Sequence, residues 1–241
     1  MSSETTTSPG TAGGTITFGR TLVDGEPVDE GLTLAADSPT LALLAEADLP
    51  LISNPIRGEY GASLVQPDSV DGEYGRALAI TPPGARGPPE HYHPGYAEQF
   101  EVVEGEFVFE VDGEARTLRA GEEITVEAGT PHTFRNESDD FASCIVENRP
   151  AGRLNEVVQL LFGLAHDGKL PDSGQPSLLQ AMVMAEAMGD DTVFTSPPVP
   201  VQRAMAAVLG PVGRRLGYRA HYPEYEADGF WEARVEQLSV S

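Results

Sequence analysis

The feature that most constrains the fold of this 241-residue chain is a series of short strand-like segments between Tyr60 and Asn148. Each segment runs for four to eight residues and is followed by turn-forming residues. The clearest turn is Asp112–Gly113, a pair that is typical of a tight β-hairpin. Strands of this length and spacing predict a β-barrel or β-sandwich. The predicted strands are 61–66, 74–81, 99–103, 107–111, 115–119, 123–126, 132–135 and 142–147.

The segments on either side of this strand series differ from it in composition. Residues 1–14 are rich in Ser, Thr and Gly and are predicted to form a disordered tail. Residues 15–57 are an N-terminal lead that mixes short strands with one short helix, and 58–149 hold the strand series. Residues 150–241 form a helical C-terminal extension. Within the lead, the expected elements are strands at 15–18 and 32–34 and a helix at 40–47.

Helical periodicity begins after Pro150. Residues 153–166 place five apolar side chains on one face, which predicts an amphipathic helix. A second helix is expected at 178–188, between a capping Ser177 and a terminating glycine. A third is expected at 200–216, although Gly210–Pro211 should kink or split it.

The charge of the chain excludes one class of partner. With 38 acidic and 15 basic residues the formal net charge is -23, and nucleic-acid binding needs clustered cations instead. Such acidity is expected either of a highly soluble surface or of adaptation to a salt-rich, halophilic cytoplasm. The sequence shows neither a signal peptide nor a membrane-spanning apolar run, and Cys144 is the single cysteine. We therefore expect a cytoplasmic protein without an intrachain disulfide.

Three residues with metal-binding chemistry occur close together before the third predicted strand. His91 and His93 are two residues apart, so an extended chain presents both imidazoles on one face. Glu98 follows five residues later, at the start of the next strand. An irregular turn between them could bring its carboxylate back towards both histidines.

A third histidine follows a later turn. Gly129–Thr130–Pro131 is typical turn sequence, and His132 opens the next strand as a candidate fourth ligand. Three neutral imidazoles and one carboxylate suit one divalent ion, with Fe, Mn, Ni, Cu and Zn all open as its identity. We predict His91, His93, Glu98 and His132 as metal ligands, and no further cofactor.

These two motifs resemble the paired motifs of the cupin superfamily. The first is matched by Gly84, His91, His93, Glu98 and Gly105, with Gly84 one residue further from the first histidine than is usual. The second is matched by Gly121, Gly129, His132 and Asn136, with Glu127 in place of the usual proline. That substitution affects a turn rather than a ligand. The motifs span about 50 of the 241 residues.

The resemblance implies an all-β fold, a double-stranded β-helix or jelly-roll barrel with the metal site in its mouth. Three functions stay open for such a protein. The first is a dioxygenase-like enzyme that acts on a small organic molecule, similar to quercetinase-like cupins, in which Glu98 serves as ligand and as catalytic proton acceptor. The second is a non-catalytic cupin that binds or senses a small ligand. The third is a metal-dependent isomerase or lyase, and a homodimer is expected by the same resemblance.

Several other residues have two interpretations. Strand alternation takes Phe100, Val102 and Phe134 inward, where they would line a ligand pocket or simply pack the core. Tyr92, Tyr96 and Arg86 lie near the expected mouth, where solvent exposure is favoured over substrate contact. His166 and His221 lie outside any motif, and Cys144 is expected in the core. Gly105, Gly121 and Gly129 are expected as turn glycines.

The C-terminal extension contains an unusual stretch, because residues 192–223 hold no Asp or Glu. Four arginines, Arg203, Arg214, Arg215 and Arg219, accompany a helical apolar pattern there. The favoured interpretation is a helix packed on its own barrel, with arginines paired to nearby carboxylates. A membrane-surface contact through 198–219 and an acidic docking partner are the alternatives.

Overall fold

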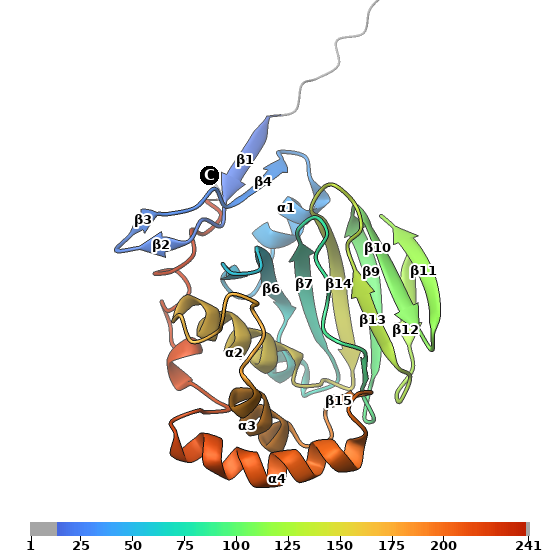
Figure 1. The fold of residues 1–241 in the computed structure, drawn as a ribbon. Coiled ribbons are helices and arrows are strands. Elements are labelled where there is room, and N and C mark those ends of the chain that lie inside the picture. Colours follow the sequence, from blue (N-terminus) through green and yellow to red (C-terminus); the bar gives the residue numbers. More distant parts are fainter. Residues whose placement is uncertain (1–13, 240–241) are drawn as a thin grey trace, which may run out of the picture.

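The computed structural model describes residues 14–239 (Figure 1). The disordered tail predicted for 1–14 therefore lies, apart from Gly14, outside the described residues. Two antiparallel sheets dominate the molecule, and two small two-stranded sheets accompany them. The small sheets pair β1 (Thr15–Phe18) with β4 (Leu32–Ala35), and β2 (Leu22–Val23) with β3 (Glu26–Pro27).

The larger sheet has six strands, in the order β12-β9-β14-β7-β6-β5. Five of them confirm predicted strands, and β5 adds a short edge strand from the N-terminal lead. Their bounds are β12 (Glu123–Val126), β9 (Ala97–Glu104), β14 (Ala142–Arg149), β7 (Gly75–Thr81), β6 (Glu59–Val65) and β5 (Ile52–Asn54).

The second sheet has five strands, in the order β11-β10-β13-β8-β15. The Asp112–Gly113 turn joins β10 to β11 as predicted, and both residues have the positive φ values, 51° and 77°, that such a hairpin turn requires. The strands β8 and β15 were not predicted, and β15 comes from the helical extension. The bounds are β11 (Glu114–Arg119), β10 (Glu106–Val111), β13 (His132–Arg135), β8 (His91–Tyr92) and β15 (Val193–Phe194).

The two sheets face each other across an aromatic and aliphatic core. Alternate residues of β9, among them Phe100 and Val102, meet Phe107 and Phe109 of β10, and the Phe100 and Phe109 rings lie 4.9 Å apart. Cys144 of β14 is fully buried in the same core, as expected. The strand-rich, two-sheet fold with a helical C-terminal part is confirmed. Between residues 14 and 239, however, no strand pairing joins the two sheets into a closed barrel.

A second core covers the opposite face of the six-stranded sheet. There Tyr60, Leu78 and Ile80 pack with Leu160 and Phe162 of α2 (Leu154–His166). The C-terminal segment adds aromatic side chains around Trp231, and η2 (Pro223–Tyr225) belongs to this segment. The N-terminal side adds α1 (Pro39–Ala45), which is capped by the Ser38 side chain, and η1 (Pro67–Val70) follows β6.

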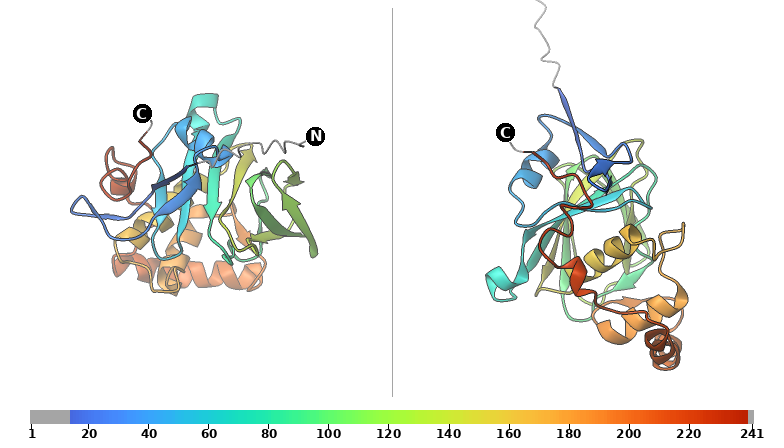
Figure 2. Two further views of the ribbon diagram at one scale, coloured as in Figure 1. Left: turned by 90° about the horizontal axis from the view of Figure 1, so that it is seen from above. Right: turned by 90° about the vertical axis from the view of Figure 1, so that its left-hand side faces the viewer.

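The helices α3 (Leu178–Met188) and α4 (Val199–Arg215) lie below the sheets, at the end opposite β1–β4 (Figures 1 and 2). Ser177 caps α3 as predicted. Of the kink or split expected at Gly210–Pro211, the split is wrong, because α4 runs through Pro211. Gly210 and Gly213 are buried, and a Cβ on either would crowd α3. Their lack of side chains lets the two helices pack closely, and this packing supports α4 through the proline.

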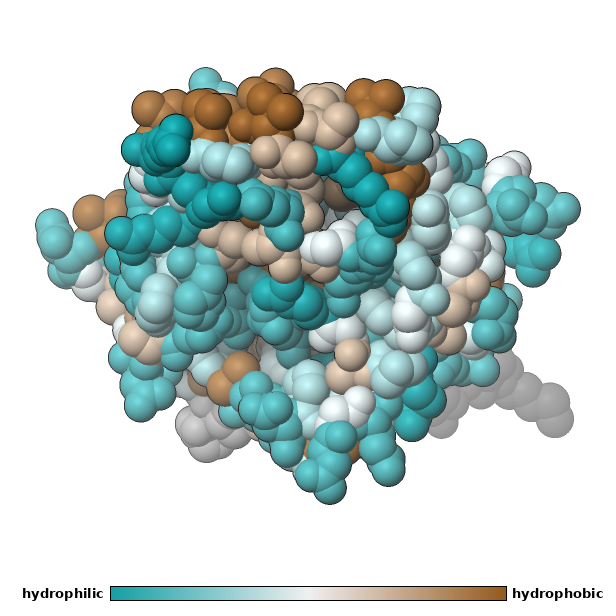
Figure 3. Space-filling view, turned by 90° about the horizontal axis from the view of Figure 1, so that it is seen from below, coloured by the Kyte–Doolittle hydropathy of each residue, from teal (hydrophilic) through white to brown (hydrophobic). Residues whose placement is uncertain are grey.

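One face of α4 leaves apolar side chains in solvent. Val201, Val208, Val212 and Leu216 are exposed, and the view from below shows apolar residues gathered along this edge of the molecule (Figure 3). No helix within 14–239 has both the length and the apolarity needed to cross a bilayer.

Candidate metal centre

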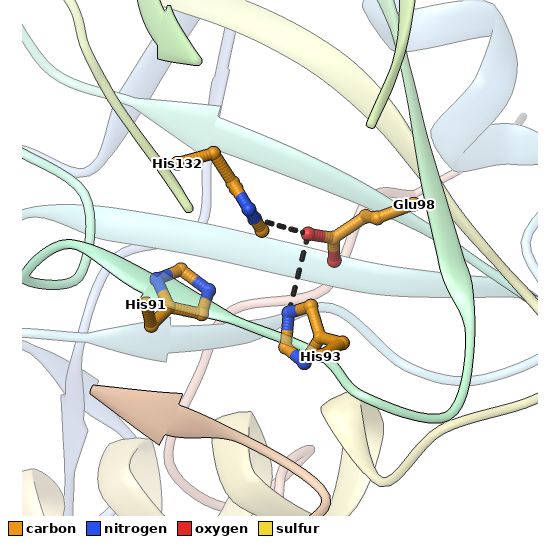
Figure 4. A group of neighbouring side chains, drawn as sticks. All are labelled: His91, His93, Glu98 and His132. Atoms are coloured by element: carbon orange, nitrogen blue, oxygen red, sulfur yellow. Dashed lines mark hydrogen bonds and ion pairs between the residues drawn. The ribbon is translucent and has the colours of Figure 1, made fainter. Parts of the chain in front are cut away.

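The four predicted ligands come from both sheets and meet between them. His91 opens β8 and His132 opens β13, and these two residues are paired neighbours in the five-stranded sheet. His93 follows β8 directly, and Glu98 is the second residue of β9 in the facing sheet. One nitrogen or oxygen atom from each lies within 4.8 Å of all the others, and all four side chains are buried (Figure 4).

Each histidine ring is held through its Nδ1 atom by a backbone carbonyl. Nδ1 of His91 lies 2.9 Å from the Pro89 oxygen, and Nδ1 of His132 lies 3.1 Å from the Thr130 oxygen. Nδ1 of His93 lies 3.1 Å from the oxygen of Asp191. A carbonyl oxygen only accepts hydrogen bonds, so these contacts assign an N–H to each Nδ1. The Nε2 atoms therefore carry free lone pairs, as in histidines that bind metals.

The Nε2 atoms of two histidines then face a carboxylate oxygen. Nε2 of His132 lies 2.8 Å from Oε2 of Glu98, and Nε2 of His93 lies 3.4 Å from the same oxygen (Figure 4). In both contacts the lone pair of an imidazole nitrogen faces the negatively charged carboxylate oxygen. A proton or a metal ion therefore has to lie between the nitrogen and the oxygen. Nε2 of His93 is buried and has no hydrogen-bond partner among the described residues. The donor set thus fits a divalent transition metal, which three imidazoles and one carboxylate would hold.

The electrostatics of the site favour the protonation states that metal binding needs at His91 and Glu98. Burial, reinforced by the charges of His132 and His93, lowers the pKa of His91 to about 4. Burial alone would raise the pKa of Glu98, but its close contacts with the imidazoles of His132 and His93 outweigh burial and hold the pKa at about 2. For His93, burial lowers the pKa while the facing carboxylate of Glu98 raises it, with a net increase. At neutral pH His91 is therefore a neutral ligand and Glu98 an anionic one.

A group around His93 was missed by the sequence analysis. The Tyr96 ring stacks on the His93 ring, with centroids 4.4 Å apart, and its hydroxyl donates to Oδ2 of Asp191 at 3.3 Å. The expectation that solvent exposure is favoured for Tyr96 is wrong, since only 6% of the residue is accessible. Asp191 and Thr192 precede β15 and lie about 98 residues from His93. No motif or periodicity marks them in the sequence.

Four further residues that the sequence singled out lie in the cavity wall, in the core between the sheets or in a loop. Phe100 and Phe134 line a cavity beside the site, whereas Val102 is buried in the core between the sheets. Asn136 is fully buried, and its Nδ2 donates to three backbone carbonyls, those of Thr81, Pro82 and Asp140, so it fastens loops.

Neither of the other two histidines joins the metal centre. His166 contacts Ser53 and Trp231, and His221 is exposed beside Glu226. Burial raises the pKa of the Cys144 thiol to about 12, so it stays protonated at neutral pH. Gly105, Gly121 and Gly129 all have positive φ, as expected of turn glycines.

The candidate centre opens onto a cavity of about 1380 Å³. His91, His93 and Glu98 line one part of it, and side chains of α2 and α3, among them Leu161 and Met184, line another. A ligand in this cavity could reach His91, His93 and Glu98, although water reaches little of their surface.

Comparison with known proteins places the motifs in a family. Residues 77–146 match the family model described as "Cupin domain". An oxidoreductase of Arthrobotrys oligospora is 28% identical over 181 residues, which cover 69% of this chain and 69% of that protein. The epoxidase atD of Aspergillus terreus is 30% identical over 169 residues, covering 64% of this chain and only 51% of the relative. A predicted oxalate decarboxylase from Thermotoga maritima, solved by crystallography, aligns with 44% of this chain and 95% of its own, at 23% identity and a TM-score of 0.39.

Proposed function

We propose that this chain, whose residues 77–146 match the cupin domain, is a metal-dependent oxidoreductase of the dioxygenase-like type that acts on a small organic molecule. The observation that carries the proposal is the meeting of two histidine Nε2 atoms and one carboxylate oxygen around a buried point. The relatives named as an oxidoreductase and an epoxidase support the class of reaction.

We propose His91, His93, Glu98 and His132 as the residues that hold one divalent ion, either Fe, Mn, Ni, Cu or Zn. An ion of this kind, when bound, supplies Lewis acidity and, for the redox-active metals, a route for electrons between substrate and O2. The chain itself supplies a buried site that excludes bulk water and fixes the three imidazoles through backbone carbonyls.

Glu98 is the proposed proton acceptor as well as a ligand. It is the single carboxylate of the centre, and it lines the cavity in which a substrate would lie. Because the neighbouring histidines hold its pKa at about 2, it is a weak base. We therefore expect a substrate whose hydroxyl is already acidic, as in a phenol or an enol.

Two alternatives stay separate from this proposal. A sensor that binds a small ligand without catalysis would use the same cavity and would differ only in its lack of turnover. An isomerase or lyase acting on a phosphorylated sugar is less favoured, because the arginines that line the cavity are each paired with a carboxylate.

The finer organisation of the molecule also belongs to the proposal. We propose a lead at 15–57, a jelly-roll cupin domain at 58–149 and a helical extension at 150–241. A cytoplasmic location, a halophilic host and a homodimer complete it. Contact of 198–219 with a membrane surface is not favoured, since Arg203 and Arg214 contact carboxylates of the chain itself.

Metal analysis of the purified protein tests the first part. We expect about one ion per chain, near-zero content in His93→Ala, and unchanged content in the matched control His221→Ala, whose ring is exposed outside the centre. Near-zero content in the wild-type protein after incubation with each of the five ions would refute the proposal.

Oxygen uptake tests the second part. The Fe(II)-loaded protein is incubated with catechols, flavonols and diketones, and we expect uptake with at least one of them that is absent in His93→Ala. Tight binding of a compound without any uptake across the panel would favour the sensor over the oxidoreductase.

A further inference from the structure

The cavity beside the metal centre is unusually large and mostly apolar. It is bounded by Phe100 and Phe134 near the ligands, by Leu161 and Met184 on the helices, and by Trp231 in the C-terminal segment. Its volume of about 1380 Å³ exceeds the range of roughly 300–1,000 Å³ that is typical of ligand pockets. A molecule with a single ring would leave most of this space unfilled.

The charges around the cavity are predominantly negative. Eight carboxylate residues line it, against three arginines and no lysine. Each arginine is paired with a carboxylate that also lines the cavity, in the pairs Arg57–Glu59 (2.7 Å), Arg153–Glu156 (2.6 Å) and Arg203–Asp190 (2.9 Å). An anionic ligand would therefore meet no unpaired guanidinium group and would be repelled by the excess of carboxylates.

Burying an anion among apolar walls adds a second cost. A carboxylate or phosphate that leaves water needs a charged or hydrogen-bonding partner to offset its lost hydration. Phe134, Leu161 and Met184 offer none, whereas they stabilise apolar surface by removing it from water.

We propose that the cavity binds a neutral, predominantly apolar molecule of more than one ring, with a single hydroxyl or carbonyl group directed to the metal centre. This inference rests on the proposed function for the role of that polar group, and it names the class of substrate. It excludes phosphorylated sugars and organic acids as the preferred ligands.

A pair of matched tricyclic probes tests the inference on the full-length, metal-free protein. 1-Adamantanol is neutral and 1-adamantanecarboxylate is anionic, and neither absorbs light where tryptophan does. Trp231 is the single tryptophan of the chain and lines the cavity, so its fluorescence reports binding. We expect the alcohol to bind about tenfold more tightly than the carboxylate, a difference of about 1.4 kcal/mol. Equal binding, tighter binding of the carboxylate, or no binding of either probe would overturn the inference.

A pair of variants links the preference to the charges of the cavity. Asp190→Asn leaves Arg203 without its carboxylate partner at the cavity wall, and we expect it to tighten carboxylate binding several-fold with little effect on the alcohol. Glu114→Gln removes the corresponding partner of Arg116 on β11, outside the cavity, and should change neither constant. An unchanged ratio in Asp190→Asn would contradict the electrostatic argument.

The outcome is independent of the metal proposal. If the wild-type protein binds metal but shows no such preference, only the inference about the substrate fails. If it shows the preference but binds no metal, only the proposed metal-dependent function fails.

Discussion

His93 depends on more neighbours than the other candidate ligands do. Its Nδ1 lies 3.1 Å from the Asp191 oxygen, and its ring stacks on Tyr96, which is itself tied to the Asp191 carboxylate. Groups that orient a ligand in this way typically contribute tenfold to a hundredfold to metal affinity. Tyr96 is therefore a positioning residue, and its ring and its hydroxyl have separable roles.

Two substitutions of Tyr96 separate these roles. Tyr96→Phe keeps the stacked ring and loses only the hydroxyl contact, so we expect a loss of metal affinity of a few-fold. Tyr96→Leu removes the stack as well, and the expected loss is about tenfold or more. Competition with a chromophoric chelator measures both, and the spectrum of the Co(II)-loaded protein should change more in Tyr96→Leu. Equal affinities in both variants and the wild type would contradict the role of the ring.

His166 predicts a pH dependence that is unrelated to the metal. It is largely enclosed near Ser53, and its ring lies 5.8 Å from that of Trp231. Burial lowers its pKa from 6.5 to about 4. As the pH falls from about 6.5 to about 4, the unfolded chain binds a proton at this residue that the folded chain does not. The folded state therefore loses stability across this window, and the loss is complete below it.

Urea unfolding of the metal-free protein at about pH 7.5 and pH 4.5 measures this loss. His166→Gln should show a smaller fall in unfolding free energy between the two pH values than the wild type. The exposed His221→Gln serves as the control and should behave as the wild type does. A fall in His166→Gln as large as that of the wild type would contradict the assignment.

Among the secondary-structure elements, β15 has the largest effect on the site for its length. It is two residues long, yet it pairs with β8 so that Phe194 lies opposite His91, and the chain just before it supplies the Asp191 oxygen to His93. Thr195 extends this contact, because its backbone N–H donates to the Glu90 oxygen at 3.0 Å. The segment around β15 thus contributes to the candidate metal centre as well as to the fold.

Replacing Thr195 tests the contribution of this strand. Thr195→Pro removes the backbone N–H that bonds to Glu90, and we expect metal affinity to fall about tenfold with the fold retained. Thr195→Ala keeps that N–H and loses only the hydroxyl contacts with Glu90, so its affinity should change by no more than a few-fold. Chelator competition and circular dichroism together give the answer. A Thr195→Pro protein with wild-type affinity would show that β15 does not support the site.

The α4 helix resolves part of the question raised by the acid-free stretch at 192–223. Arg203 and Arg214 pair with Asp190 and Glu186, which belong to α3 or follow it directly. These contacts support the interpretation of a helix packed on its own chain. For these two arginines the carboxylate partners come from α3 and the turn after it, outside the acid-free stretch.

For the whole molecule, the formal net charge of -23 is a source of self-repulsion. Compacting so many like charges costs free energy that mobile ions reduce, since the Debye length shortens from about 10 Å at 0.1 M salt to about 3 Å at 1 M. The folded state, in which the charges lie closer together, gains more from screening than the unfolded chain does.

We therefore expect the melting temperature to rise by several degrees between about 0.1 M and about 2 M KCl. Sucrose at matched osmolarity controls for solvent effects that do not involve charge, and it should raise the melting temperature less. A melting temperature that falls with KCl, or that responds equally to sucrose, would argue against both the self-repulsion and the halophilic interpretation.

The sequence by itself determined the strands from β6 to β14 apart from β8, the three C-terminal helices and the identity of the four converging residues. Local periodicity indicates which side of a strand or helix is buried. The two motifs place His91, Glu98 and His132 at or near the first residues of strands. These features depend on residues that are close together in the chain.

Only the tertiary structure decided which distant segments complete the site. The approach of Asp191 to His93, the hydrogen bond from Tyr96 to Asp191, the pairing of β15 with β8 and the cavity enclosed by α2 and α3 all join residues far apart in sequence. Such contacts leave no periodic pattern, because a single hydrogen bond to a backbone carbonyl places almost no constraint on the residue type that provides it.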